Sequence, residues 1–173
     1  RRASGRHHAV PAARLPGVTV TAVDTDDTRR PVVEALGSGF ARPEHAPADA
    51  DIVFHCSATS AGLNTAINCA GLEATIVEMS WYGSKPVQVE LGGAFHSHRL
   101  KLVASQVGMV SSGRRPRWDY RRRLTAALRL LAEPALDALV TEEIDFEDTP
   151  KRLPQIFAAR THGLAPVIRY PNS

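Results

Sequence analysis

The alternation of short apolar segments with helical segments in the first half of the chain constrains the fold most. Residues 18–24 (VTVTAVD), 50–58 (ADIVFHCSA) and 73–81 (EATIVEMSW) have the alternating or continuous apolar character of strands. Residues 26–37 and 60–71 lie between them, have helical character and each end at a glycine. Strands joined through helices form parallel crossover units. We therefore predict an α/β fold, with helices on both faces of a doubly wound parallel sheet.

The remaining segments predict a more mixed arrangement. The loop 37–49 has room for one short strand, and residues 120–140 begin as an amphipathic helix that breaks at Pro134. A later helix is expected to begin near Asp148 or Thr149. Further strands are predicted at 87–93, at 99–108, around Ile144 and at 164–170.

The length and the two cysteines are typical of one globular domain inside a cell. A chain of 173 residues is long enough to bury a core, and no apolar run is long enough to cross a membrane. The basic start RRASGRHH leads into PAAR, which does not resemble a signal peptide. Cys56 and Cys69 lie in apolar segments without metal-ligand spacing, so we expect reduced, buried thiols in a cytoplasmic protein.

Arginine clusters raise the question of a nucleic-acid partner. They lie at 1–6, 114–117 and 121–123, and the last two flank Trp118 and Tyr120. Such a mixture of basic and aromatic side chains can meet phosphates and bases. The net charge of +3 is modest, however, and acids are spread through the chain. We expect solvated helix starts here, and binding of nucleic acid remains only the third alternative.

An acid, Asp24, directly follows the strand 18–24 and is the first candidate site residue. A carboxylate at the end of the second strand of a dinucleotide-binding fold accepts the ribose hydroxyls of adenosine and repels a 2′-phosphate. Asp26 and Asp27 are better placed to cap the next helix. Asp24 could also be a simple helix-start acid, but the strand–helix alternation around it favours the ribose role.

The glycine-rich turn that should precede this acid by about twenty residues is missing. Gly5 has the spacing of its third glycine, but RRASG contains neither of the others and follows no apolar strand. Residues 6–13 (RHHAVPAA) should form the phosphate-facing helix, yet contain basic groups and a proline. We expect a truncated chain whose residues 1–11 are an aberrant N-terminus, produced by a frameshift or a misplaced start.

Three stretches in order carry a resemblance to a known family. They are AARLPGVTVTAVDTDDTRRPVVEALG, ADIVFHCSATSAGLNTAINCAGLEATIVEMSWYG and LLAEPALDALVTEEIDFEDTPKRLPQIFA with GLAPVIRYP. From about 12 to 171 the chain resembles the C-terminal half of the medium-chain dehydrogenase/reductase family, zinc-type alcohol dehydrogenases. The resemblance implies an incomplete Rossmann-type sheet lacking its first strand. It also implies a partial nicotinamide-dinucleotide domain at 12–117, and at 118–173 its last part with the return segment to the catalytic domain.

The resemblance also implies a set of cofactor-binding residues. Asp24 matches the ribose-binding acid, and Arg29 matches a basic residue on the adenosine side. The other matching positions follow later strands: Cys56 and Ser57 with His55, then Glu78, Met79 and Ser80, and last Gln106, near the nicotinamide. The implied cofactor is NAD, although Arg29 and Arg30 leave NADP open.

Neither a metal centre nor a catalytic constellation is predicted in this chain. No residues match the zinc ligands of the family, so zinc is expected only in a full-length relative. His96 and His98 share a face of a probable strand but have no evident third ligand. Ser57 follows a strand near His55, but S-A-T-S-A-G is no nucleophile elbow, so no catalytic triad is expected.

The resulting prediction is an NAD(P)-dependent oxidoreductase that transfers hydride between a small alcohol or carbonyl substrate and nicotinamide. In this chain it is expected as a truncated, inactive C-terminal half. The alternative is a non-catalytic remnant that binds a dinucleotide or forms a homodimer through a sheet edge at residues 85–107. A third reading, binding of nucleic acid, predicts an affinity that falls steeply with salt.

Overall fold

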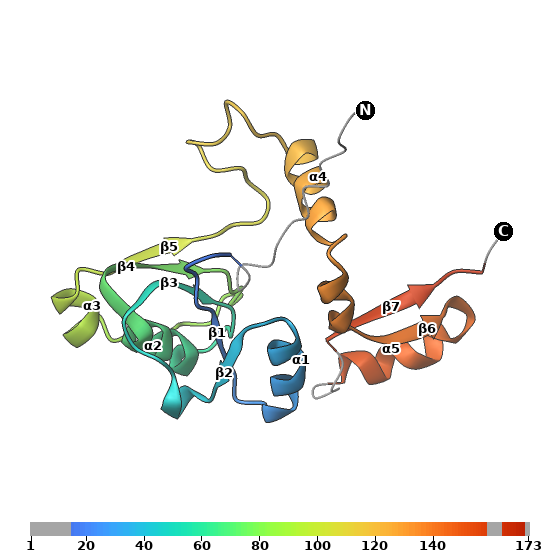
Figure 1. The fold of residues 1–173 in the computed structure, drawn as a ribbon, viewed down its shortest axis with the longest axis horizontal. Coiled ribbons are helices and arrows are strands. Elements are labelled where there is room, and N and C mark those ends of the chain that lie inside the picture. The colour runs from blue at the N-terminus through green and yellow to red at the C-terminus, as the bar shows by residue number, and fades with distance from the viewer. Residues whose placement is uncertain (1–14, 159–163, 172–173) are drawn as a thin grey trace. The chain divides into compact units, whose positions relative to one another are not determined.

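The computed structural model describes residues 15–158 and 164–171. Its strands and α-helices follow one another along the chain (Figure 1) as β1 (Thr21–Val23), α1 (Arg30–Ala35), β2 (Gly39–Ala41), β3 (Ala50–His55), α2 (Ser60–Cys69), β4 (Ala70–Glu78), α3 (Gly93–Ser97), β5 (Lys101–Ala104), α4 (Tyr120–Leu130), β6 (Val140–Asp145), α5 (Thr149–Phe157) and β7 (Ala165–Arg169). The expected aberrant N-terminus, residues 1–11, lies outside the described residues.

The described residues fall into two compact units. The first contains the described parts of 1–22, 26–40 and 121–173, and the second contains 23–25 and 41–120. Within the described residues, no helix is both long and apolar enough to span a membrane.

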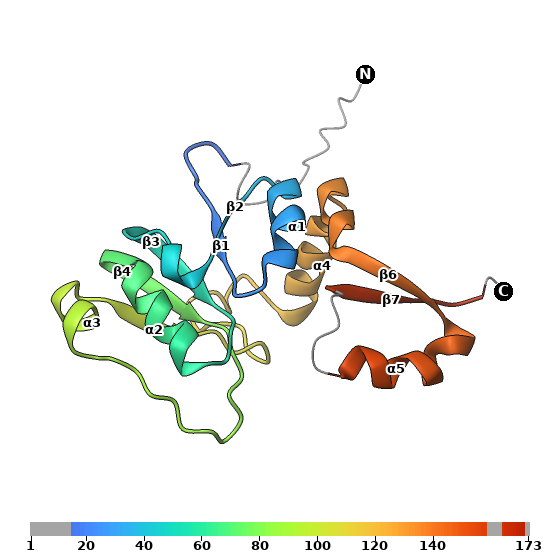
Figure 2. The same cartoon turned by 90° about the horizontal axis from the view of Figure 1, so that it is seen from below.

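The second unit is built on a parallel sheet in the order β3-β4-β5. The helix α2 connects β3 to β4 and packs on both strands, and α3 lies beside α2 (Figures 1 and 2). The register places His55 opposite Glu78, and Glu78 opposite Ala104. The carboxyl ends of all three strands therefore meet at one edge of the sheet.

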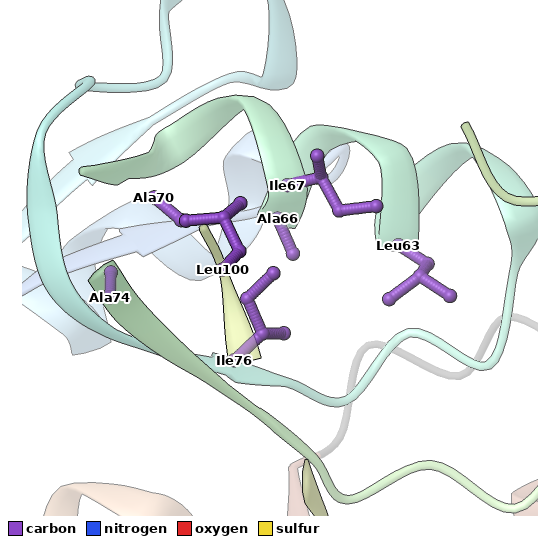
Figure 3. Packing of buried hydrophobic residues seen from close by; sticks show 7 residues of the cluster. All are labelled: Leu63, Ala66, Ile67, Ala70, Ala74, Ile76 and Leu100. Atoms are coloured by element: carbon purple, nitrogen blue, oxygen red, sulfur yellow. The ribbon is translucent and has the colours of Figure 1, made fainter. Parts of the chain in front are cut away.

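The hydrophobic core of this unit lies between α2 and the sheet (Figure 3). Ile67 on α2 and Ile76 on β4 are 2% and 0% exposed. Small residues on α2 bring the helix backbone close to the strands, so the apolar side chains fill the space between them. The buried cluster consists of Leu63, Ala66, Ile67, Ala70, Ala74, Ile76 and Leu100.

The first unit contains a second parallel pair, β6 and β7, with α5 packed against β6 (Figure 2). An ion pair between Arg169 Nη2 and Asp145 Oδ1, 2.7 Å apart, joins the carboxyl ends of these strands. The helix α4 ends at Leu130, and a 3-10 helix, η4 (Pro134–Leu139), begins at the proline. The predicted break at Pro134 is therefore confirmed.

The prediction of an α/β fold with parallel strands is confirmed, including the short strand in the loop 37–49. The predicted strand at 87–93 is wrong. There, the backbone N–H groups of Gln88 and Glu90 donate to the side chains of Ser60 and Asn64 on α2, at 3.1 and 3.0 Å. Because helix side chains satisfy these groups, the segment covers α2 and joins no sheet.

The strand predicted at 99–108 is shorter than expected, because β5 ends at Ala104. The expectation for the cysteines is half right. Cys69, on the core face of α2, is buried, whereas Cys56 is exposed. Cys56 follows the buried His55, and successive residues of an extended chain point to opposite sides.

Candidate functional site

Most of the cofactor-binding residues predicted from the sequence lie at or just beyond the carboxyl ends of β3, β4 and β5. Two hydrogen bonds continue the sheet past the strands: Met79 N–H donates to the His55 carbonyl at 2.9 Å, and Ser105 N–H to the Glu78 carbonyl at 2.8 Å. In open parallel sheets, ligands bind outside the carboxyl ends of the strands. The second unit places its polar side chains at this edge.

His55, the last residue of β3, is at the centre of these side chains. It is a buried polar side chain, only 4% exposed. Its Nδ1 lies 2.7 Å from Glu78 Oε2, and its Nε2 lies 2.7 Å from Ser57 Oγ. A buried imidazole needs partners for both ring nitrogens, and this one has a carboxylate on one side and a hydroxyl on the other.

Glu78, the last residue of β4, forms hydrogen bonds with three residues, His55, Ser80 and Tyr82. The Ser80 backbone N–H donates to its Oε1 at 2.7 Å, and the Tyr82 hydroxyl donates to its Oε2 at 2.9 Å. Burial alone would raise the pKa of Glu78, but the hydrogen bonds from Ser80, His55 and Tyr82 lower it below its ordinary value. Glu78 is therefore a carboxylate at neutral pH.

Tyr82 donates a hydrogen bond to this carboxylate, which in turn affects the pKa of the Tyr82 phenol. Burial, the hydrogen bond to Glu78 and the charge of Glu78 raise the pKa of its phenol to about 12. A negative phenolate beside the Glu78 carboxylate would be repelled by it. Tyr82 therefore stays a hydrogen-bond donor over the whole physiological range.

The turn after β3 is tied to the turn after β4 and to the start of α2. Ala58 N–H donates to Ser80 Oγ at 3.1 Å. Thr59 caps α2, and its side-chain oxygen accepts from Gly62 N–H at 3.0 Å and lies 3.0 Å from Ser57 Oγ. Capping by threonine satisfies a backbone donor that the helix itself cannot.

Gly62 is required by the close approach of α2 to the site. A Cβ at this position would lie 2.0 Å from Ser57 Oγ and 3.0 Å from His55 Nε2. No side chain fits at such distances, so glycine lets the first turn of α2 pack directly against the serine and the imidazole.

The structure brings together three side chains that the sequence analysis did not connect. Ser57, His55 and Glu78 form a hydrogen-bonded chain with the order of a serine–histidine–acid triad. Sequence reasoning missed it because the acid is 23 positions from the histidine. Only the register of β3 and β4 brings them together. The signal in the sequence that could have indicated this pairing is that His55 and Glu78 each end an apolar strand.

Four more of the predicted cofactor residues, Cys56, Met79, Ser80 and Gln106, follow the strands that end at this edge. Ser80 belongs to the hydrogen-bonded cluster, and Met79 is 52% exposed beside it. Cys56 is exposed, and burial together with the Glu78 charge raises the pKa of its thiol. Gln106 follows β5, two residues beyond its last position.

Asp24 also belongs to the second unit and is half-buried after β1. Its backbone N–H donates to the Ala41 carbonyl on β2 at 3.1 Å. Arg42, which the sequence analysis did not single out, follows β2. Its Nη1 donates to the Thr25 carbonyl at 3.1 Å and its Nε to Glu44 Oε1 at 3.0 Å. The turn that carries Asp24 is thus fixed by the end of β2.

Arg29, the predicted adenosine-side residue, lies in the first unit. Its Nε is 3.7 Å from Asp26 Oδ2. Asp26 also caps the 3-10 helix η2 (Asp27–Arg29), where it accepts from Thr28 N–H at 3.0 Å. The predicted capping role of Asp26 is therefore confirmed.

The described part of the chain contains no group of three or more His, Cys, Asp or Glu side chains that could hold a metal ion. His96 lies in α3 and His98 ends it, so the probable strand on which they were expected to share a face is wrong. His98 Nδ1 lies 3.3 Å from the Ala70 carbonyl, a structural contact.

Comparison with known proteins identifies the fold. No protein-family model matches the chain, and no curated protein matches its sequence. Among solved structures, the 2R,3R-butanediol dehydrogenase of Bacillus subtilis is 15% identical with a TM-score of 0.67 over 89% of this chain. A zinc-binding dehydrogenase of Sinorhizobium meliloti bound to NADP is 15% identical with a TM-score of 0.65 over 87%. A Bacillus subtilis protein with NAD bound is 14% identical with a TM-score of 0.62 over 93%.

These similarities confirm the expected fold: the chain resembles part of each of these proteins. The chain spans 44%, 45% and 49% of the lengths of these three proteins, that is, less than half of each.

Proposed function

We propose that this chain binds a nicotinamide dinucleotide as part of an oxidoreductase of the zinc-type alcohol dehydrogenase family. One observation carries the proposal: Ser57, Glu78 and Ser80 gather at the carboxyl ends of parallel strands. That edge is where open α/β sheets bind ligands. The similar structures with NADP and NAD bound support a cofactor of this class.

The side chains of the second unit are of the chemical types that bind such a cofactor. Asp24 would accept hydrogen bonds from the ribose hydroxyls of adenosine. Its turn is held in place by the hydrogen bond to the Ala41 carbonyl and by the hydrogen bond from Arg42 to the Thr25 carbonyl. Hydroxyl groups of Ser57 and Ser80 and the amide of Gln106 would supply neutral donors. An uncharged donor set suits the polar, weakly charged nicotinamide end.

The cofactor supplies the hydride chemistry when it is bound, and the chain's residues bind and orient it. His55 and Glu78 hold Ser57, while Ala58 N–H and Glu78 hold the two turns in place. Fixed side chains at such an edge lower the ordering cost of binding.

The charge of Asp24 supports NAD as the cofactor, because this carboxylate would repel a 2′-phosphate.

Zinc is a separate matter, because the described residues form no group able to hold it. We therefore assign no step to a metal in this chain. Zinc and the small alcohol or carbonyl substrate belong to the proposal for the complete enzyme of this family.

The test is a titration of the chain with NADH, followed by its fluorescence. We expect binding that the exchange Asp24→Ala weakens about tenfold or more, because the ribose loses its acceptor. The matched control is Asp51→Ala, which removes an exposed acid near the amino end of β3 and should leave affinity unchanged. NADPH should bind more weakly than NADH. Absence of NADH binding by the folded chain would refute the proposal.

Homodimer formation is the second candidate function. Among the described strands, β5 pairs only with β4 and lies at the end of the sheet. An edge strand offers unpaired backbone groups to a second copy. Sedimentation equilibrium would show a dimer, and Val103→Pro on β5 should return it to monomers.

A further inference from the structure

We propose that Ser57 is an activated nucleophile and that this chain transfers acyl groups from small carboxylic esters to water. The inference goes beyond dinucleotide binding and does not depend on it. It stands on the hydrogen-bonded chain from Ser57 through His55 to Glu78 and on the place of Ser57 before α2.

The direction of the hydrogen bonds fixes the role of each group. Glu78 is a carboxylate and can only accept, so His55 Nδ1 must carry the proton that it donates. In the neutral imidazole, Nε2 then carries no proton and accepts from the Ser57 hydroxyl, whose Oγ lies 2.7 Å away. This is the tautomer that a general base requires to take a proton from serine.

The acid at the end of this chain is itself positioned. Ser80 N–H and the Tyr82 hydroxyl donate to Glu78, at 2.7 and 2.9 Å. Because His55 is 4% exposed, water does not compete for its ring nitrogens. A base that is oriented by a fixed carboxylate is the recurring arrangement of activated serine nucleophiles.

Ser57 lies in a strained turn between a strand and a helix. The serine lies between the end of β3 and the start of α2, and Ala58 after it has φ of 52°. Left-handed backbone costs a residue other than glycine about 1–2 kcal/mol, so the turn is held against strain. Ser57 is exposed, while Gly62 lets α2 approach it.

Donors for a developing oxyanion are close in the chain. The first helical hydrogen bond of α2 is Leu63 N–H to the Thr59 carbonyl. The N–H groups of Ser60 and Ala61, in the first turn, therefore have no acceptor within the helix. The positive end of the helix dipole also favours negative charge there.

The reaction balances without a further reagent. Ser57 Oγ attacks the ester carbonyl carbon as its proton passes to His55 Nε2, and a tetrahedral oxyanion forms. The carbon–oxygen bond of the ester breaks, and the leaving alcohol takes the proton from His55. Water then attacks the acyl serine by the same route, which releases the carboxylic acid and restores the Ser57 hydroxyl.

Covalent labelling with a fluorophosphonate and hydrolysis of 4-nitrophenyl acetate test the proposal on the chain as it stands. In labelling, Ser57 Oγ displaces fluoride from phosphorus and His55 takes the proton. We expect one label per chain, located on Ser57 by mass spectrometry. Both reactions should fall about 100-fold or more in Ser57→Ala and in His55→Gln, since general-base activation contributes that much.

The control is Ser112→Ala, which removes an exposed serine far along the sequence and should leave both rates unchanged. Circular dichroism shows whether the His55→Gln variant remains folded. If that variant is unfolded, the Ser57→Ala variant, which loses only an exposed hydroxyl, decides the test. A folded chain whose Ser57 takes no label, or whose ester hydrolysis is equal in Ser57→Ala, overturns the proposal. The NADH titration is a separate measurement, so a negative result for ester hydrolysis would not refute the proposal of dinucleotide binding.

Discussion

His55 Nδ1 lies 2.7 Å from Glu78 Oε2, and the two residues stand opposite each other on the neighbouring parallel strands β3 and β4. The pair joins the strands through side chains where their backbone ladder ends. Because His55 is buried and Glu78 carries a charge, the link lies in a poorly hydrated place, where a broken hydrogen bond is costly.

The exchange His55→Ala should therefore destabilise the chain strongly. It leaves the Glu78 carboxylate and the Ser57 hydroxyl without their imidazole partner and opens a cavity. We expect a loss of about 2–4 kcal/mol in the free energy of unfolding. Urea titration followed by circular dichroism measures it, with the exposed His45→Ala as the control. Equal midpoints for the two variants would show that the pair contributes nothing to the fold.

Gly62 should tolerate no side chain. In Gly62→Ala the new methyl group would lie 2.0 Å from Ser57 Oγ, so α2 must move away from the turn. Overpacking of this kind costs about 1–3 kcal/mol. Gly113→Ala is the matched control, because a Cβ there meets nothing within 4 Å. Thermal unfolding should separate the two variants, and a similar melting temperature would contradict the close approach.

The parallel strands could be predicted from the sequence because their signals are local. Continuous apolar runs at 50–58 and 73–81 and a small-residue helix between them suffice to predict a crossover unit, and β3, α2 and β4 follow it. The boundaries moved by a few residues, as at β4, which begins at Ala70 directly after α2.

The hydrogen-bonded cluster could not be predicted in the same way, because it depends on register. His55 was noticed, but its partners Glu78 and Tyr82 lie 23 and 27 positions away. A shift of one residue between β3 and β4 would turn Glu78 to the other face of the sheet. The strand prediction for 87–93 was wrong for a related reason: Val87 and Val89 of its apolar alternation pack against the buried cluster of the second unit.

Ile76 on β4 should be the most sensitive apolar position of the second unit. It is 0% exposed, so Ile76→Ala leaves a cavity between α2 and the sheet. We expect a loss of about 2–5 kcal/mol in the free energy of unfolding. Leu72→Ala, at a position 71% exposed on the same strand, should change it by less than about 1 kcal/mol. Equal losses in chemical denaturation would contradict the described core.

The loss of folding stability at acidic pH should depend in part on Glu78. Its pKa is lowered in the folded chain, so its contribution is present above the unfolded value, near 4.5, and is lost as the pH falls through the folded value. Glu78→Gln removes that loss. The variant should be less stable at pH 7 and show a flatter decline below pH 4.5 in urea titrations at each pH. A parallel decline in both proteins would assign the loss of stability at acidic pH to other carboxyls.

Tyr82 should account for part of the loss of folding stability at alkaline pH, because its pKa is raised and not lowered in the folded chain. Burial and Glu78 raise its folded pKa to about 12 from an unfolded value of 10.0. Its stabilising contribution is therefore complete below pH 10 and is lost as the pH rises toward 12. Absorbance of tyrosinate near 295 nm should show one late-titrating phenol that is missing in Tyr82→Phe, while Tyr170→Phe, at a position 65% exposed, keeps it. If all tyrosines of the folded chain ionised together near pH 10, the hydrogen bond from Tyr82 to Glu78 would not exist in solution.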